Sequence, residues 1–242
     1  MNERTITLRV QRQSSPTAPP RWEGFTLPWR PDMSVATCLV ELRDGPRSDP
    51  GDARPPIEWT ECHGRCSAQC AMRINGRARA ACTARVDELE EDLVTLQPLA
   101  KFVVIRDLII DREPMIRNIE GLRMGAEDAP AVPGRRGEDA AFDIARCTRC
   151  GLCLETCPQV NERSDYLGPA PIVHTLFFST LPSGRANARQ RLAAIMGRGG
   201  IADCGNAQNC VEVCPERIPL TEALGTLARH TTALWLARPP RA

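Results

Sequence analysis

Two cysteine runs in the C-terminal half decide how this chain folds. The first is Cys147-Thr-Arg-Cys150-Gly-Leu-Cys153-Leu-Glu-Thr-Cys157-Pro158, with the spacing C-x2-C-x2-C-x3-C-P. The second is Cys204-Gly-Asn-Ala207-Gln-Asn-Cys210-Val-Glu-Val-Cys214-Pro215. When the two prolines are aligned, the runs match position for position, except that Ala207 stands where the first run has Cys150. The chain therefore carries one loop twice, with one thiol missing from the second copy.

The spacing of the first run is the one that holds iron–sulfur cubanes. Three cysteines at intervals of three direct their thiolates to one cluster, and the fourth, fixed by the proline after it, serves a second cluster. Applied to both runs, this rule gives a [4Fe–4S] cluster four ligands: Cys147, Cys150, Cys153 and Cys214. The second cluster receives Cys157, Cys204 and Cys210, one thiolate fewer than a cubane needs. We therefore expect it to be [3Fe–4S].

Zinc and disulfides are the competing uses of such cysteines. Structural zinc prefers two separated pairs of ligands for each tetrahedral site. A disulfide framework is typical of small secreted chains. Neither explains a duplicated spacing with a proline after each copy. Cluster ligation is therefore the favoured interpretation.

A third cysteine group lies in the N-terminal half. Its members are Cys62, Cys66, Cys70 and, after a gap, Cys82. Asn75-Gly76 favours a tight hairpin turn between Cys70 and Cys82. A cysteine loop followed by a single later cysteine, after two strands and a helix, describes the plant-type [2Fe–2S] domain. We expect these four cysteines to bind that cluster.

The spacing of this third group is C-x3-C-x3-C, whereas the usual loop is C-x4-C-x2-C. The middle cysteine, Cys66, stands one place early, and Ser67 occupies the usual position. We favour Cys66 as the ligand because thiolate is the softer and better iron donor. A histidine ligand at His63 would make the site Rieske-like, an alternative that four available cysteines weaken. Cys38 is predicted not to be a ligand, because it lies on the apolar face of a helix expected over residues 35–42.

Apolar periodicity indicates an α+β fold. Strands are expected at Thr5–Gln11 and Trp22–Trp29, and the segment Val103–Asp111 is expected to be the closing strand. Helical spacing begins near Glu113, and further helices are expected over Pro171–Ser179, Arg189–Met196 and Thr221–Ala237. Residues 1–110 are thus expected to form a β-grasp, plant-type [2Fe–2S] ferredoxin domain. Residues 111–242 are expected to form an all-α, bacterial-type two-cluster ferredoxin domain.

Some weaker features are also interpreted. Trp235, on the terminal helix, is expected in the core rather than on a face toward a membrane anchor. His174 and His230 are expected to be packed or surface residues. The polar stretches 44–56 and 125–139, rich in proline and glycine, are expected to be loops or connectors.

Whole-chain composition limits the function. The 242 residues are enough for two modest domains, and a net charge of +1 gives no sign of a nucleic-acid or anionic-membrane partner. The first residues contain no apolar signal core, and no stretch approaches the ~20 apolar residues that span a bilayer. We expect a soluble chain in a reducing compartment, where its twelve cysteines stay available as ligands.

Together these motifs resemble the iron–sulfur subunit of succinate dehydrogenase and fumarate reductase. The resemblance rests on Met72–Cys82, Arg106–Asp111, the runs at 147–158 and 204–215, and Tyr166-Leu-Gly-Pro-Ala-Pro171. It implies that the chain, which would carry no succinate site itself, takes electrons from an FAD-containing flavoprotein subunit. They would pass through [2Fe–2S], [4Fe–4S] and [3Fe–4S] to quinone at a membrane anchor that can carry haem b.

The resemblance also implies where the chain works. It places the protein peripherally, on the cytoplasmic face of the bacterial plasma membrane, through anchor subunits. Pro158 and Gln159 would lie near the quinone. Gln159, together with the lack of tryptophan before Tyr166, resembles the menaquinone branch of the family.

Two other function classes remain as alternatives. A soluble multi-cluster carrier for a cytoplasmic oxidoreductase, glycolate- or heterodisulfide-linked, would usually have two complete cubane runs, and Ala207 argues against it. A cluster-containing structural or sensor protein would not need three clusters in sequence. Electron transfer in a membrane respiratory complex is the leading interpretation.

Overall fold

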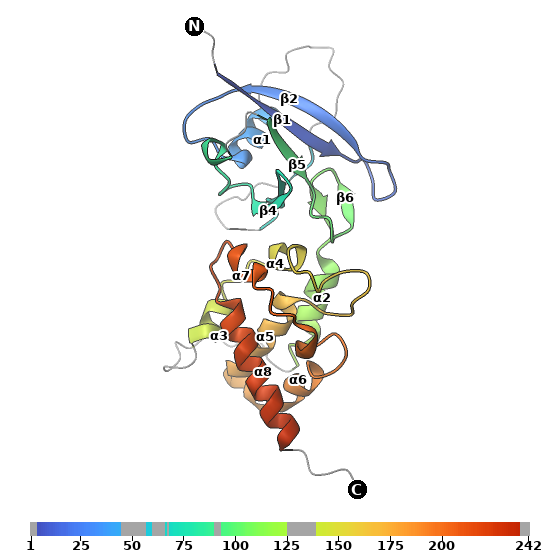
Figure 1. Ribbon diagram of the computed structural model, residues 1–242, viewed down its shortest axis with the longest axis vertical. Coiled ribbons are helices and arrows are strands. Elements are labelled where there is room, and N and C mark those ends of the chain that lie inside the picture. The colour runs from blue at the N-terminus through green and yellow to red at the C-terminus, as the bar shows by residue number, and fades with distance from the viewer. Residues whose placement is uncertain are drawn as a thin grey trace. The chain divides into compact units, whose positions relative to one another are not determined.

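The computed structural model describes residues 4–44, 57–59, 66, 68–89, 93–124 and 139–237. The chain forms two compact units that divide between Asp111 and Arg112 (Figure 1). The first unit contains the strands and one α-helix, and the second is helical. The two stretches expected as loops, 44–56 and 125–139, lie outside the described residues except at their ends.

A five-stranded sheet forms the first unit, with the strand order β2-β1-β5-β3-β4. Its strands are β1 (Thr5–Arg12), β2 (Arg21–Pro28), β3 (Ala71–Ile74), β4 (Arg77–Ala80) and β5 (Leu93–Gln97). β1–β2 and β3–β4 are antiparallel hairpins, as local alternation and the Asn75-Gly76 turn predict. β5 joins them by pairing parallel to β1 and antiparallel to β3.

The expectation that Val103–Asp111 closes the sheet is wrong. This segment forms β6 (Val104–Arg106) and β7 (Ile109–Ile110), which pair with each other in a separate two-stranded sheet. Asp107 lies between them with a φ of 46°, and its carboxylate accepts backbone N–H groups from Gln13 (2.9 Å) and Glu58 (3.0 Å). The apolar run therefore turns back on itself, and the central position goes to β5, where Val94 and Leu96 are fully buried.

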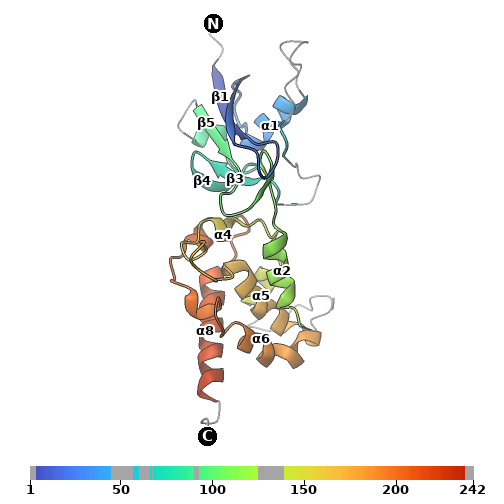
Figure 2. The ribbon, with the colours of Figure 1, turned by 90° about the vertical axis from the view of Figure 1, so that its right-hand side faces the viewer.

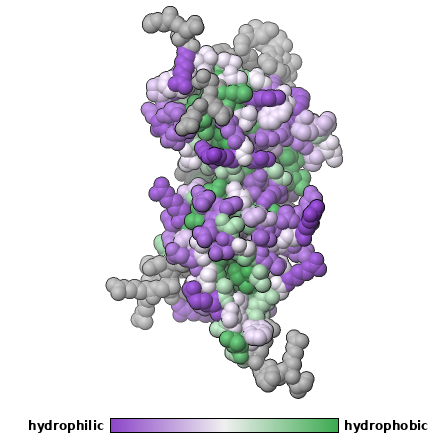
Figure 3. Space-filling view, viewed as in Figure 1, coloured by the Kyte–Doolittle hydropathy of each residue, from purple (hydrophilic) through white to green (hydrophobic). Residues whose placement is uncertain are grey.

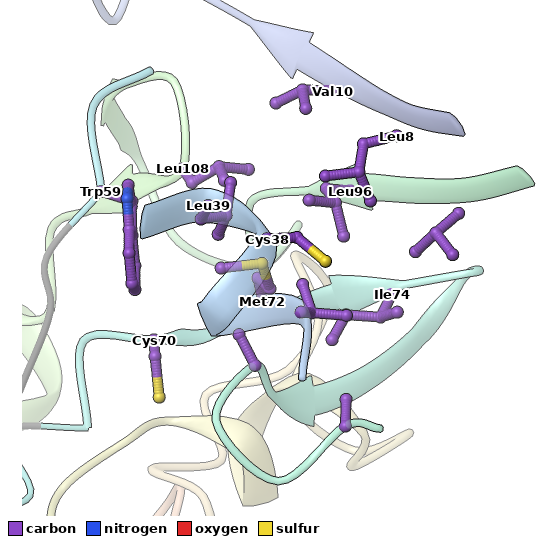
Figure 4. Close-up of a cluster of buried hydrophobic side chains, with 14 of the residues drawn as sticks. Leu8, Val10, Cys38, Leu39, Trp59, Cys70, Met72, Ile74, Leu96 and Leu108 are labelled. Atoms are coloured by element: carbon purple, nitrogen blue, oxygen red, sulfur yellow. The ribbon is translucent and has the colours of Figure 1, made fainter. Parts of the chain in front are cut away.

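Helix α1 (Val35–Asp44) packs its apolar face into the core of the first unit. The Ser34 hydroxyl accepts the backbone N–H of Thr37 (3.1 Å), an N-cap that fixes where the helix begins. Cys38 is fully buried and lies among core side chains that include Leu39 and Met72 (Figure 4). Its place on the apolar face agrees with the helical spacing of the sequence.

Seven α-helices are described in the second unit. They are α2 (Glu113–Gly121), α3 (Asp139–Ile144), α4 (Leu152–Glu155), α5 (Pro169–Thr180), α6 (Ala188–Ala194), α7 (Asn209–Glu212) and α8 (Leu220–Leu236). Short 3-10 helices occur at η1 (Val86–Glu88) in the first unit and at η2 (Pro182–Asn187) and η3 (Ile201–Asp203) in the second. α5 is buried on almost every side and contacts α2, α3, α4, α6 and α8. Figure 2 shows α5 among α2, α4, α6 and α8. α5 is the centre around which the helices pack.

The last helix, α8, expected over Thr221–Ala237, has a buried stripe of Leu220, Leu224 and Leu227. Its final turn is different, because Trp235 is 62 % exposed and Leu236 is 69 % exposed. The expectation of a core tryptophan at 235 is therefore wrong. Apolar surface is visible where α8 ends (Figure 3). Within the described parts of the chain, no helix has the length and apolarity that crossing a membrane requires.

Candidate iron–sulfur cluster sites

The two cysteine runs fold into the same local structure. Arg149 and Asn206 occupy equivalent positions with φ of 56° and 52°, and Gly151 and Gln208 follow with φ of 85° and 65°. A four-residue helix comes next in each run, α4 in the first and α7 in the second. The sequence repeat is thus also a repeat of the backbone. Ala207 takes the place on the second loop that Cys150 takes on the first.

The two loops are held side by side by the ends of their helices. The Asn209 side-chain amide donates to the carbonyl of Thr156 (3.0 Å), and the Thr156 hydroxyl donates to the carbonyl of Asn209 (3.5 Å). α4 and α7 are in contact. This pairing brings the proline-linked end of each run toward the other run.

A first cavity gathers cysteines from both runs. Its wall contains Cys147, Cys150, Cys153 and Cys214, together with apolar atoms of Ala170, Ile218 and Leu220. Burial raises the pKa of Cys147 to about 11, and it also raises the pKa of Cys150 and of Cys153. Neighbouring thiols add to these shifts because two negative charges would repel. Without a positive centre these groups hold their protons, so metal binding must release them.

A second cavity gathers the remaining cysteines of the two runs. Cys157, Cys204 and Cys210 line it, and so do Pro158, Gln159 and Ala207. Burial raises the pKa of Cys210 to about 11, with further contributions from Cys157 and Cys204. The methyl group of Ala207 thus stands on the wall of a three-thiol cavity.

The donor sets fit iron–sulfur clusters. Thiolates are the usual ligands of such clusters, and each cavity offers several of them in a largely apolar surrounding. Among the described residues, no three His, Cys, Asp or Glu side chains are close enough together to hold one metal ion. The cysteines instead stand around the wall of each cavity.

The third cysteine group is described only in part. The Cys70 and Cys82 sulfurs are 3.6 Å apart, at the ends of the β3–β4 hairpin, whose backbone closes through the Ala81 N–H to the carbonyl of Cys70 (2.9 Å). Cys70 is buried, whereas Cys66 and Cys82 are exposed. Cys62, His63 and Ser67 lie outside the described residues. Ligation by Cys62 and Cys66 stays a prediction.

A polar cleft of about 740 Å³ opens beside the second cavity. The cleft and the cavity share Gln159, Cys204 and Gly205. A Cβ at Gly205 would lie 2.5 Å from the Gln159 side-chain nitrogen, so the glycine leaves room for that amide. The rest of the cleft is polar and includes Arg163 and an ion pair between Asp165 and Arg198.

Sequence reasoning missed several residues around these cavities. Arg163, Asp165 and Arg198 carry no motif, and only the fold places them at the cleft. Gly205 gives a weak signal, as a glycine directly after a candidate ligand. His174 is packed, as one of the two expected outcomes has it, with Nδ1 2.7 Å from the carbonyl of Ala170. Burial lowers the pKa of His174 to about 4, which keeps the ring neutral.

Comparison with known proteins identifies both units. A model of the 2Fe-2S iron-sulfur cluster binding domain matches residues 7–117, and a model of the 4Fe-4S dicluster domain matches residues 143–218. The succinate dehydrogenase iron-sulfur subunit of Bacillus subtilis is 38 % identical, and the match covers 95 % of this chain and 93 % of that protein. The fumarate reductase iron-sulfur subunit of Wolinella succinogenes is 25 % identical over 96 % of this chain and 99 % of its own length.

A solved structure shares the fold over 98 % of the chain. A chain of the Mycobacterium smegmatis Sdh1 complex in the apo form superposes with a TM-score of 0.70 at 22 % identity, and the match covers 98 % of this chain and 99 % of that chain. The repeated loops, the two cysteine-lined cavities and these matches agree. This chain belongs to the family of iron–sulfur subunits of succinate dehydrogenases and fumarate reductases.

Proposed function

We propose that the chain relays single electrons between a flavoprotein subunit and a membrane quinone in a succinate:quinone oxidoreductase. One observation carries this proposal: around each of two cavities, cysteines of one run meet cysteines of the other. Such crossing places two electron-accepting centres next to each other on one rigid scaffold. As an iron–sulfur subunit, the chain works within a multi-subunit complex that contains flavoprotein and membrane subunits.

We propose ligands for the two C-terminal clusters, supported by the cysteines that share each cavity. Cys147, Cys150, Cys153 and Cys214 would hold [4Fe–4S], and Cys157, Cys204 and Cys210 would hold [3Fe–4S]. When bound, such clusters accept and release one electron at a time at a potential that their surroundings set. The protein supplies the thiolates and a wall that excludes water. At Ala207 it supplies a methyl group, which cannot bind a fourth iron.

The [2Fe–2S] cluster would be held by Cys62, Cys66, Cys70 and Cys82. Two sulfurs bound about 2.3 Å from one tetrahedral metal, the zinc–sulfur value, lie about 3.8 Å apart. The Cys70 and Cys82 sulfurs are 3.6 Å apart, so these two cysteines suit the same metal. We assign them to one iron, which leaves Cys62 and Cys66 for the other.

The quinone would bind where the polar cleft meets the second cavity. The cleft volume of about 740 Å³ falls within the range of small-molecule sites. Gln159 lines both spaces, and its amide can donate a hydrogen bond to a quinone carbonyl. Pro158 lies beside it on the cavity wall. We propose menaquinone as the substrate, with an anchor subunit that can carry haem b, on the cytoplasmic face of the membrane.

Purification of the native complex tests this function. We expect the chain to copurify from membranes with an FAD-containing subunit and a membrane subunit, and the preparation to reduce a menaquinone analogue with succinate. Electron paramagnetic resonance of the oxidised complex should show a half-integer-spin three-iron centre. A soluble carrier would instead purify without a membrane subunit. It would contain two [4Fe–4S] clusters and no three-iron signal in anaerobic preparations.

Reduction of a soluble dye by succinate is the matched control. It depends on the flavoprotein and not on the quinone. We expect Gln159→Ala to lower quinone reduction several-fold while dye reduction is retained. Gly205→Ala should act in the same direction, because the new methyl group displaces the Gln159 amide. If both variants reduce quinone at the normal rate, the proposed position of the quinone is wrong.

A further inference from the structure

Each cluster cavity has one buried hydroxyl group beside it that lacks a partner. The Thr148 Oγ1 and the Tyr166 Oη are both buried, and neither has a hydrogen-bond partner among the described residues. A buried hydroxyl without a partner costs about 1–3 kcal/mol. Beside a cavity lined by cysteines, such a hydroxyl is a candidate donor to a sulfur atom.

Tyr166 does not line the second cavity itself but lies beside its three cysteines. The residue is 4 % exposed, and its hydroxyl is within reach of the Cys204 side chain, with Cys157 and Cys210 also nearby. A phenol is protonated at neutral pH, so its hydroxyl can act as a hydrogen-bond donor.

Thr148 lies at the first cavity and helps to line it. Its hydroxyl is within reach of the Cys150 side chain. Cys150 and Cys204 belong to different candidate ligand sets. The two cavities therefore share one arrangement, in which a hydroxyl faces the sulfur of one cysteine.

The chemistry of sulfur explains why these hydroxyls are unpartnered in the thiol state. A neutral thiol is a weak hydrogen-bond acceptor, so a hydroxyl beside it gains little. A thiolate bound to iron is charged, and hydrogen bonds to charged acceptors are about twice as strong. Loading of the clusters would convert both sulfurs into good acceptors.

We infer that the Tyr166 hydroxyl donates a hydrogen bond to the Cys204 sulfur of the [3Fe–4S] site, and that Thr148 does the same to Cys150 of the [4Fe–4S] site. This inference rests on the ligand sets proposed above. Each hydrogen bond stabilises negative charge on the ligating sulfur. Because reduction adds an electron to the cluster, the reduced form gains more than the oxidised form, and the reduction potential rises. Tyr166 and Thr148 are thus positioning residues that act through a cysteine.

Tyr166 is expected to act on one cluster and Thr148 on the other. In the assembled complex, each variant can therefore be compared at both clusters. Redox titration followed by electron paramagnetic resonance measures both midpoint potentials in one sample. Tyr166→Phe removes only the hydroxyl and should lower the reduced-to-oxidised ratio of the three-iron centre roughly tenfold at fixed ambient potential. That ratio corresponds to about 59 mV for a one-electron couple. The [4Fe–4S] midpoint should stay unchanged.

Thr148→Val should give the reverse pattern, with a lower [4Fe–4S] midpoint and an unchanged three-iron midpoint. Thr148→Ser keeps the hydroxyl and is its matched control, with an expected midpoint close to that of the native protein. The inference is overturned if either variant loads its clusters normally and leaves the adjacent midpoint where it was. Equal shifts of both midpoints in each variant would also contradict it.

A measurement on the native complex does not depend on how the variants fold. Exchange into D2O should replace a proton coupled to the oxidised three-iron centre, and electron–nuclear double resonance should detect the change. The strongest exchangeable coupling should be missing in Tyr166→Phe. If the native centre shows no such coupling beyond what the Phe variant retains, Tyr166 does not contact the cluster. The cluster type and the copurifying subunits test the proposed function, whereas the midpoint potentials and the exchangeable coupling test this inference. Failure of one can therefore be distinguished from failure of the other.

Discussion

Cysteine side chains have two different roles in this protein, and the surroundings of each cysteine determine its role. Cys38 is fully buried among apolar side chains of the first unit, where burial raises its pKa to about 11 (Figure 4). Burial also raises the pKa of Cys147, Cys153 and Cys210 in the second unit, yet these cysteines line cavities in groups of three and four. An isolated buried thiol is a small hydrophobe, whereas grouped thiols can share a metal cluster.

Cys38→Ala should leave the iron content and the cluster spectra unchanged. It should also change how stability depends on pH. The ordinary thiol pKa is 9.0, and the folded value is about 11. As the pH rises between these values, the unfolded chain loses the proton and the folded chain keeps it, so stability falls.

This loss amounts to at most about 3 kcal/mol. Denaturant unfolding measures this loss of stability. The free energy of unfolding is compared between a pH near neutrality and a pH between the two pKa values, for the native protein and for Cys38→Ala. The variant should lose less stability on going to the higher pH. Loss of any cluster signal in the variant would contradict the assignment of Cys38.

At the scale of elements, hairpins could be predicted and the central strand could not. β1–β2 and β3–β4 are joined by short connections, so alternation and the Asn75-Gly76 turn contain most of the information. β5 has only Val94 and Leu96 as fully buried positions, and its neighbours β1 and β3 are distant in sequence. The apolar run at 103–110 looked like the better strand because the turn at Asp107 depends on contacts with Gln13 and Glu58.

The element α6 contains a buried cation that fixes the C-terminal unit. Arg191 is fully buried, and its guanidinium donates to the carbonyls of Arg123 (3.2 Å), Met124 (3.0 Å) and Gly184 (2.8 Å). It also donates to the Ser179 hydroxyl (3.1 Å). These acceptors come from the ends of α2 and α5 and from η2. One side chain thus joins three elements.

Arg191→Met should therefore lower the stability of the second unit by about 3 kcal/mol, because several carbonyls lose their donors in a buried place. Arg189→Met is the matched control, since Arg189 lies on the same helix and is exposed. It should change stability by less than about 0.5 kcal/mol. Thermal unfolding of both variants measures the difference. Equal effects would mean that the change of charge, and not the buried contacts, matters.

At the scale of the whole molecule, the spacing of the cysteines predicts the types of cluster. It does not predict the cleft beside the second cavity. That Cys214 shares a cavity with the first run, and Cys157 a cavity with the second, could be predicted, because in such runs the cysteine before the proline serves the other cluster. The cleft at Gln159 could not be predicted. Arg163, Asp165 and Arg198 become its wall only through the packing of segments that are separate in sequence.

Ligation of each cluster by cysteines from both runs can be tested by substituting single cysteines. Cys214→Ser should damage the [4Fe–4S] signal although its other three ligands lie in the first run. Cys157→Ser should damage the three-iron signal although its other two ligands lie in the second run. Electron paramagnetic resonance of oxidised and reduced complexes distinguishes the two centres. If each substitution affects the cluster of its own run, the cysteines that share a cavity do not share a cluster.

Ala207 leaves the second cavity with three cysteines instead of four. Its loop has the same positive-φ positions and the same short helix as the loop of Cys150, so a cysteine there would enter the cavity already lined by Cys157, Cys204 and Cys210. Ala207→Cys should convert the three-iron centre toward [4Fe–4S], with a fourth iron taken up at the new thiolate, and lower its potential, because cluster type is one of the determinants of the reduction potential.

An acceptor of lower potential at the end of the relay is harder to reduce. Quinone reduction by succinate should therefore slow several-fold in Ala207→Cys, while dye reduction changes much less, because the flavoprotein is untouched. Ala207→Ser is the control, since it fills a similar volume with a much weaker iron donor. It should keep the three-iron signal and the native rate. A Cys variant that keeps that signal and the native potential would show that position 207 does not face the cluster, and the crossed ligand sets would have to be reassigned.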